Sequence, residues 1–250
     1  MQVYMEAQES AGKKDGSQIK IAMRILKDYA GEMVTLDQID GDFCRGYITY
    51  LLTEYHPKGK DISNYTLHNY YRALNGALNS AVRKKKMKAN PFNELEKSEK
   101  IRKPESMRSY MTIEEVQALI DTPMPHEEYE IVKCAYLFSC FCGLRSSDII
   151  KLKWKDVFVD RGQYRLAVSM KKTKEPIYLP LSPEALKWMP ERGGKSSEDN
   201  VFDLPSANTI RMQLKPWAKA AGISKRFSYH TSRHTFATMM LTLGADLYTV

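Results

Sequence analysis

The sequence predicts a mainly α-helical protein with a small three-stranded antiparallel sheet, divided into two domains. Apolar residues repeat at helical spacing in the first part of the chain, and a charged, poorly periodic stretch follows them. Between Lys153 and Leu181 the apolar spacing changes to every second residue, which is typical of strands. We therefore expect a helical domain over residues 1–92, a basic linker over 93–110 and a second domain over 111–250.

The first domain is predicted to contain three helices. Residues 19–29 and 43–52 place apolar side chains at helical spacing, and glycine-containing turns separate the two segments. The apolar stripe of the third helix runs from residue 67 to residue 82, and Ser63 or Asn64 can cap its start by accepting a free backbone N–H group. One apolar stripe on each helix is enough to build a shared core.

The net charge of +8 is concentrated at the end of the third predicted helix. Residues 83–103 hold nine basic side chains and three acidic ones. Such clustering favours the release of counterions from a phosphate backbone, whereas a solvated surface usually mixes its signs. Part of the run also has a structural interpretation, because cations at a helix C-terminus complement the helix dipole. The candidate DNA-binding residues here are Arg83, Lys84, Lys85, Lys86 and Lys88.

The second domain should be built around one strongly apolar helix, at residues 129–142. A shorter helix precedes it, and Thr112 with Glu115 forms the capping-box pattern at its start. Three short strands follow within residues 157–181, where apolar side chains alternate. Two further helices are expected to begin after the N-caps Ser182 and Ser206.

The composition excludes several classes of protein. No apolar run approaches the roughly 18 to 20 residues that span a bilayer. The polar N-terminus shows no secretory signal, so we expect no membrane partner and a cytoplasmic location. The four cysteines fit reduced thiols, and Cys140 with Cys142 lacks a second pair of zinc ligands. We expect neither a metal nor another cofactor.

Three segments of the second domain can be interpreted as parts of a phosphate site. In the first, Arg145 follows Gly143 at the end of the apolar helix, and Ser146 or Ser147 can cap the next helix. The N-terminus of that helix would itself favour an anion. The alternative interpretation is that Arg145 only caps the preceding helix or pairs with Asp148.

The second segment is a lysine-rich turn between the second and third predicted strands. A lysine at a hairpin tip can reach a phosphodiester and donate a proton, since its pKa falls near other cations. Lys172 is the candidate proton donor, and Lys171 and Lys174 are its rivals and candidate DNA-binding residues. Lysines on a surface turn are otherwise simply solvated.

The third segment begins at His230. His230 and Arg233 are three residues apart, so on a helix they share one face and can converge on one group. His230 and His234 have the spacing of a metal-binding pair, but the arginine beside them and the lack of an adjacent carboxylate argue against zinc. His234 can also be a packing residue.

Taken in this order and after a basic helical domain, these segments resemble the tyrosine recombinase, or phage integrase, family. The resemblance implies a SAM-like core-binding domain followed by an integrase-type catalytic domain. It is close from about Met111 onward, general before that, and strongest toward the integrases of mobile elements. The matching pieces are Gly143-Leu144-Arg145, Lys172-Thr173, His230-x-x-Arg233-His234-Thr235-Phe236-Ala237-Thr238 and Leu243-Gly244-Ala245-Asp246.

The resemblance implies site-specific recombination of double-stranded DNA, often by a homo-tetramer on paired DNA sites. A tyrosine attacks the scissile phosphate, forms a 3′-phosphotyrosine link and releases a 5′-hydroxyl, with neither ATP nor metal. Arg145 and Arg233 would then hold the non-bridging oxygens. Lys172 would protonate the leaving oxygen, and His230 would accept or donate a proton near the nucleophile.

One part of the family pattern has no counterpart in the sequence. The family places a Leu-Gly-His segment and the nucleophilic tyrosine well beyond the arginine that matches Arg233, whereas Tyr248 follows it by only fifteen residues. We therefore do not expect Tyr248 to be the nucleophile, and we expect this chain alone to lack cleavage activity. Two other hypotheses remain: a catalytically silent DNA-binding fragment that competes for integrase sites, and a type IB topoisomerase.

Overall fold

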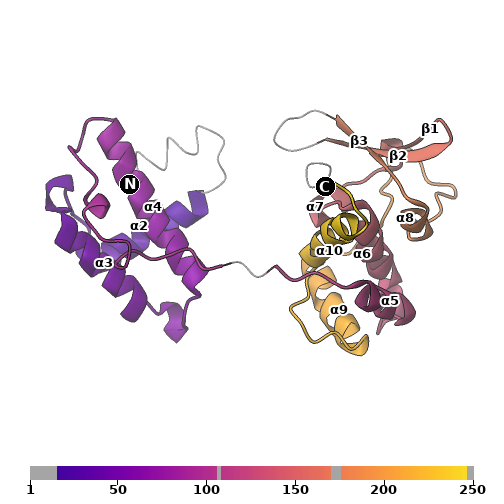
Figure 1. Ribbon diagram of the computed structural model, residues 1–250, viewed down its shortest axis with the longest axis horizontal. Coiled ribbons are helices and arrows are strands. Elements are labelled where there is room, and N and C mark those ends of the chain that lie inside the picture. The colour runs from indigo at the N-terminus through magenta and orange to yellow at the C-terminus, as the bar shows by residue number, and fades with distance from the viewer. Residues whose placement is uncertain (1–15, 106–107, 170–175, 247–250) are drawn as a thin grey trace. The chain divides into compact units, whose positions relative to one another are not determined.

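The computed structural model describes residues 16–105, 108–169 and 176–246. The chain forms two compact units that divide between residues 106 and 107, and each is described by itself (Figure 1). Helices dominate both units, and the second also holds a three-stranded antiparallel sheet. The predicted fold class is confirmed.

The first unit is built from three long helices that share one core. They are α2 (Gly16–Ala30), α3 (Gly41–Thr53) and α4 (Asn64–Arg83), with the short 3-10 helices η1 (Leu36–Gln38), η2 (Pro57–Gly59) and η3 (Pro91–Asn93). The predicted apolar stripes meet in this core, which buries Ile25, Tyr47 and Leu74. Asp40 caps α3, and Ser63, one of the two predicted caps, accepts a backbone N–H of α4.

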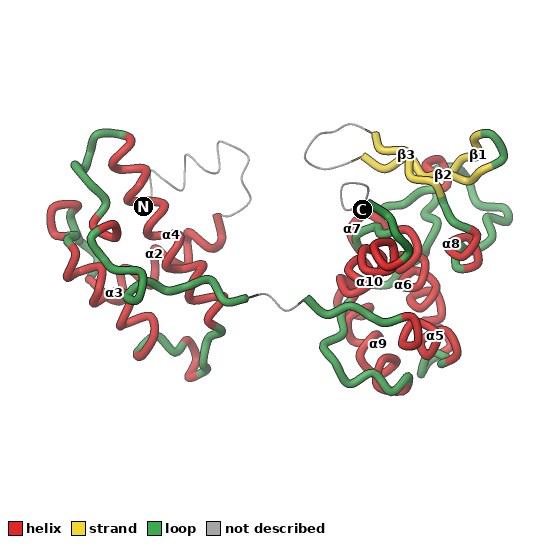
Figure 2. The backbone as a smooth tube through the Cα atoms, in the orientation of Figure 1, coloured by secondary structure: helices red, strands yellow, loops and turns green. Residues whose placement is uncertain are grey.

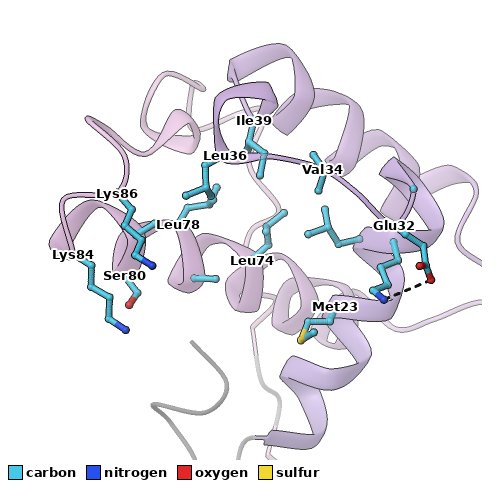
Figure 3. Close-up of a pocket in the computed structure, with 15 residues that line it drawn as sticks. Met23, Glu32, Val34, Leu36, Ile39, Leu74, Leu78, Ser80, Lys84 and Lys86 are labelled. Atoms are coloured by element: carbon cyan, nitrogen blue, oxygen red, sulfur yellow. Dashed lines mark ion pairs between the residues drawn. The ribbon is translucent and has the colours of Figure 1, made fainter. Parts of the chain in front are cut away.

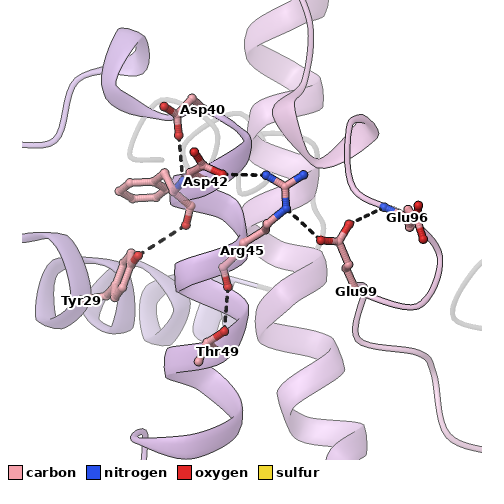
Figure 4. A network of polar contacts seen from close by, with 8 residues as sticks. Tyr29, Asp40, Asp42, Arg45, Thr49, Glu96 and Glu99 are labelled. Atoms are coloured by element: carbon pink, nitrogen blue, oxygen red, sulfur yellow. Dashed lines mark hydrogen bonds and ion pairs between the residues drawn. The ribbon is translucent and has the colours of Figure 1, made fainter.

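The segment after η3 packs against the first unit. Leu95 and Ile101 lie in its core. Arg45 of α3 donates from Nε to Oε1 of Glu99 at 2.8 Å, within the polar network of Figure 4. Much of the stretch predicted as linker is therefore part of the first unit's surface and core, while the domain bounds at 92 and 111 stay predictions.

The second unit is organised around α6, as the sequence predicts (Figure 2). Its elements are α5 (Ile113–Asp121), η4 (Glu127–Tyr129), α6 (Glu130–Cys142), α7 (Ser146–Ile149), η5 (Trp154–Asp156), α8 (Pro183–Lys187), α9 (Ala207–Ala220) and α10 (Tyr229–Thr242). Residues of α6 belong to two cores: Tyr136 and Leu137 pack with α5 and α9, whereas Ala135 and Phe138 pack toward the sheet and α8. Because α6 is buried on nearly every side, it can hold the turn that follows its C-terminus, with Gly143 and Arg145, in one position.

The sheet has the order β1-β2-β3, with β1 (Val157–Asp160), β2 (Gln163–Ser169) and β3 (Pro176–Pro180). Leu166 pairs with Val157 on one side and Leu179 on the other, and its side chain is fully buried. The alternating pattern therefore identified the core side in part: Leu166 and Leu181 are buried and Val157, Val168 and Leu179 pack against the core, whereas Val159, Tyr164 and Ile177 are exposed.

The remaining helix starts confirm three predicted caps and correct one, since Ser182 accepts a backbone N–H of α8 and Ser206 accepts one of α9. Thr112 and Glu115 form the predicted capping box of α5. The prediction that Ser146 or Ser147 caps α7 is wrong, because Arg145 occupies the N-cap position and Ser146 is the first helical residue. The backbone of Arg145 is extended (φ −75°, ψ 152°), as an N-cap residue requires.

Candidate phosphate-binding site

Arg145 lies on a tight turn between α6 and α7. Gly143 ends α6 in the left-handed region (φ 71°), where its N–H donates to the carbonyl of Ser139 at 2.9 Å. The side chain of Arg145 is 51% exposed, and its Nη1 atom lies 4.0 Å from Oδ2 of Asp148. This ion pair is the alternative role that the sequence allows for Arg145, but at that distance it leaves most guanidinium donors free.

Helix α10 is anchored against α6 by Tyr229. The Tyr229 hydroxyl donates to the carbonyl of Ala135 at 2.8 Å and lies 2.9 Å from Oγ of Ser139. Burial raises the pKa of Tyr229 far above its ordinary value. Tyr229 is therefore a structural anchor and no candidate for a nucleophile.

A second contact ties the segment before α5 to α10. The backbone N–H of Met111 donates to Oγ1 of Thr235 at 2.9 Å, and the same hydroxyl donates to the carbonyl of Thr231 at 2.9 Å. Both threonines are buried. Since Arg108 lies three residues before Met111, this contact also brings a further cation close to α10.

Arg233 is held from α10 to the end of α6. Its Nη1 atom donates to the carbonyl of Gly143 at 2.5 Å. The ring of Phe236, one helical turn further along α10, lies against Gly143 as well. Arg233 is therefore held at the turn that carries Arg145, although the two residues are far apart in the sequence.

The two guanidinium groups act on each other electrostatically. Burial lowers the pKa of Arg233, and the positive charge of Arg145 lowers it further. A guanidinium keeps its proton in proteins, so the shift expresses first the cost of burying the Arg233 charge and then the cost of holding it near Arg145. A bound anion would offset both costs.

The two histidines of α10 differ in their surroundings. His230 is exposed, and its ring centroid lies 4.6 Å from that of His234 in an edge-to-face arrangement. Burial lowers the pKa of His234, and the positive charges of His230, Arg108 and Arg233 lower it further. His234 is therefore mainly neutral at pH 7, and His230 is the histidine that a ligand can reach.

The lysine-rich turn lies outside the described residues. Ser169 of β2 pairs with Pro176 of β3, and Lys171, Lys172 and Lys174 lie between them, outside the described residues. The proposed roles of these lysines stay predictions. Tyr248 also lies outside the described residues.

The basic run of the first unit surrounds the end of α4. Arg83 is the last helical residue, Lys84 is the C-cap and Lys85 has a positive φ of 56°. Lys84 and Lys86 line one side of an apolar pocket of about 370 Å³ between α2, η1 and α4 (Figure 3). All five predicted DNA-binding residues of this run are exposed; they are Arg83, Lys84, Lys85, Lys86 and Lys88.

Neither a metal cluster nor a membrane span emerges from the described residues. Within residues 16–105, 108–169 and 176–246, no three His, Cys, Asp or Glu side chains gather as metal ligands would. In the same ranges no helix is both long and apolar enough to cross a bilayer. Cys140 and Cys142 are buried, and burial raises the pKa of Cys142 to about 12.

Sequence reasoning missed the residues that hold the site together. Thr235 and Phe236 belonged to the motif that carried the resemblance, but nothing in the local pattern assigned them partners at Met111 and Gly143. Arg108 was unremarkable in a charged stretch. Each of these contacts joins residues far apart in the chain, for which a single sequence carries no local signal.

Comparison with known proteins agrees with this geometry. A model of the phage integrase family matches residues 109–250, and a model of the phage integrase SAM-like domain matches residues 1–112. Tyrosine recombinase XerD of Vibrio vulnificus (strain YJ016) is 31% identical over 162 residues, covering 59% of this chain and 52% of the relative. Tyrosine recombinase XerC of Pelobacter propionicus is 27% identical over 227 residues, covering 87% of this chain and 71% of the relative. The chain thus spans about half the length of the Vibrio relative.

Solved structures share the fold. A lambda integrase dimer bound to a COC′ core site superposes with a TM-score of 0.68 at 19% identity, covering 99% of this chain and 87% of that chain. A Tn1549 transposon integrase in complex with a circular-intermediate DNA superposes with a TM-score of 0.74 at 18% identity, covering 98% and 87%. With one family model over more than half of its residues, the chain belongs to the phage integrase family.

Proposed function

We propose that this chain is the DNA-binding and phosphate-holding part of a site-specific recombinase, which cleaves and rejoins DNA through a 3′-phosphotyrosine intermediate. The observation that carries the proposal is the meeting of Arg145 and Arg233 at the α6–α7 turn, where Arg233 donates to the Gly143 carbonyl. Membership of the phage integrase family supports it.

The arginine pair suits the charge that develops during attack on a phosphodiester. The transition state gathers negative charge on its non-bridging oxygens, and fork-shaped guanidinium groups bind such oxygens two at a time. Arg233 donates one N–H to the Gly143 carbonyl, and its other N–H groups can donate to a phosphate. Relief of the repulsion between Arg145 and Arg233 would make phosphate binding more favourable still.

His230 and Lys172 would move the protons. His230 is exposed one turn before Arg233, so it would lie beside a phosphate held by the arginines and exchange a proton near the attacking tyrosine. Lys172 would protonate the leaving 5′-oxygen, with Lys171 and Lys174 as alternatives. The bond energy stays in the phosphotyrosine link, so strand rejoining needs no external energy source.

Double-stranded DNA is the proposed partner, and a homo-tetramer on paired sites is the proposed assembly. The solved lambda integrase tetramer bound to a Holliday junction supports this by likeness of fold. The exposed lysines after α4 would contact backbone phosphates, with Lys171 and Lys174 adding contacts from the second unit. A DNA substrate also favours the predicted cytoplasmic location.

A suicide-substrate assay on the complete product of the gene tests the function. A nick beside the scissile phosphate lets the released piece diffuse away, so a covalent protein–DNA adduct accumulates. We expect an adduct from the unaltered protein, and a loss on the order of 100-fold for Arg145→Ala. Arg211→Ala, which removes an exposed arginine of α9, is the matched control and should leave the yield unchanged.

Each alternative predicts a different result. Specific binding without any adduct would favour the silent competitor, and relaxation of supercoiled DNA regardless of sequence would favour the topoisomerase. Tyr248→Phe should leave the adduct intact, because we do not expect Tyr248 to be the nucleophile. An adduct yield unaffected by Arg145→Ala would contradict the proposed site.

A further inference from the structure

Gly143 has a close neighbour on the side where a Cβ would point, which the other described glycines of positive φ lack. Its φ of 71° lies in the left-handed region, and so do the φ angles of six other described glycines. At none of those six would an added Cβ meet an atom within 4 Å; they are Gly31, Gly59, Gly162, Gly193, Gly222 and Gly244. Backbone conformation alone therefore does not explain the environment of Gly143.

At Gly143 an added Cβ would collide with an aromatic ring. It would lie 2.5 Å from Cδ1, 2.8 Å from Cε1 and 3.1 Å from Cγ of Phe236. Three atoms of one ring at such distances mean that the ring packs directly against the glycine Cα. A half-buried ring on a helix has few alternative rotamers, so a Cβ would displace α10 or the turn.

The same glycine also binds Arg233 of α10. Arg233 and Phe236 are three residues apart, so they lie on one face of the helix. Arg233 donates to the Gly143 carbonyl, while Phe236 covers the Gly143 Cα. Arg145 follows only two residues later, so the Gly143 peptide fixes the position of the Arg233 guanidinium relative to the backbone of Arg145.

We infer that Gly143 is a positioning residue, which places Arg233 beside the turn that carries Arg145 by admitting the Phe236 ring against its Cα and binding Arg233 through its carbonyl. The importance of this placement for cleavage rests on the proposed function. The packing and the arginine contact do not depend on it.

The first test is a double-mutant cycle on single-turnover cleavage. Gly143→Ala should slow adduct formation by on the order of 10- to 100-fold, because small misplacements of catalytic groups have effects of that size. The affinity for DNA should change by less than about threefold, since most phosphate contacts lie elsewhere. Phe236→Ala makes room for the Cβ, so adding Gly143→Ala to that variant should slow cleavage by less than about twofold.

Gly222→Ala is the matched control. Gly222 has a φ of 76° with no atom near an added Cβ, so alanine there bears the same left-handed strain without a collision. It should lower the melting temperature and leave cleavage unchanged. If Gly143→Ala does not fold, variants of Phe236 test the inference instead. Phe236→Ala should slow cleavage, and Phe236→Tyr, which keeps the ring, should cleave at the rate of the unaltered protein.

The second test needs no catalysis. The side-chain N–H signals of Arg233 in an NMR spectrum report its bond to the Gly143 carbonyl, and Arg233→Lys assigns them. Gly143→Ala should shift these signals and Gly222→Ala should not. Unshifted signals, or equal slowing of cleavage by Gly143→Ala with and without the Phe236 ring, would overturn the inference. Failure of the unaltered protein to form an adduct would instead overturn the proposed function, and the NMR result would still decide the role of Gly143.

Discussion

At the residue scale, the site is defined by cations that are held near one another. Arg145 is half exposed and lies 4.0 Å from Asp148, whereas Arg233 is partly buried and donates to a backbone carbonyl. The two arginines therefore have different tasks before DNA arrives. Arg233 is fixed in place, and Arg145 remains free to turn toward a phosphate.

His234 should make the second unit sensitive to acid. Burial and the nearby cations lower its pKa below 6.5, so the unfolded chain binds a proton more readily than the folded one. The stabilising contribution is present above pH 6.5 and is lost as the pH falls through the lowered pKa of the folded state. Urea unfolding between pH 5 and pH 8 should show this loss, and His234→Gln should flatten it. An identical pH profile for the variant would contradict this account.

At the element scale, helix α10 is positioned by polar contacts. Its buried residues are Thr231, Ser232 and Thr235 rather than large apolar side chains. Tyr229 bonds it to α6, and Thr235 receives the N–H of Met111. Hydrogen bonds of this kind fix orientation more narrowly than apolar packing does, which suits a helix that carries Arg233.

Thr235→Val should therefore destabilise the second unit. Valine keeps the shape but leaves the buried Met111 N–H without an acceptor, which costs about 1 to 3 kcal/mol. Thr242→Val is the matched control, since Thr242 also donates to the carbonyl four residues earlier on α10 but is exposed. Urea unfolding measures both. Equal costs for the two variants would show that the contact to Met111 contributes nothing.

Local elements could be predicted from the sequence, and their long-range partners could not. The capping box of Thr112 and the alternation around Leu166 depend on neighbours in sequence, and both were confirmed. The N-cap before α7 was assigned to serine by residue preference, but the turn after Gly143 places Arg145 there. The packing of Phe236 on Gly143 joins residues ninety-three positions apart, so only the folded chain shows it.

At the scale of the whole molecule, each unit carries its own basic surface. The lysines after α4 extend from the first unit, and the arginines of the α6–α7 turn and α10 belong to the second. We expect the first to supply affinity through backbone phosphates and the second to act on one phosphate. The two contributions can be measured separately.

Charge reversal at Lys84, Lys85 and Lys86 should weaken DNA binding and flatten its dependence on salt. Each backbone phosphate that the variant no longer neutralises should reduce the slope of log affinity against log salt by about one unit. Reversal of Arg211, Lys215 and Lys219, which are exposed on α9, controls for the change in net charge. An unchanged slope in the first variant would show that these lysines do not contact DNA phosphates and only complement the dipole at the end of α4.

The central claim is that Arg145 and Arg233 neutralise one scissile phosphate, and a neutral substrate tests it most directly. A methylphosphonate at the cleavage position lacks the charge that the arginines would balance. Arg145→Ala should lose cleavage of the ordinary site by on the order of 100-fold and recover most of it on the methylphosphonate. If Arg145→Ala is equally defective on both substrates, Arg145 does not act on the charge of that phosphate and the account is wrong.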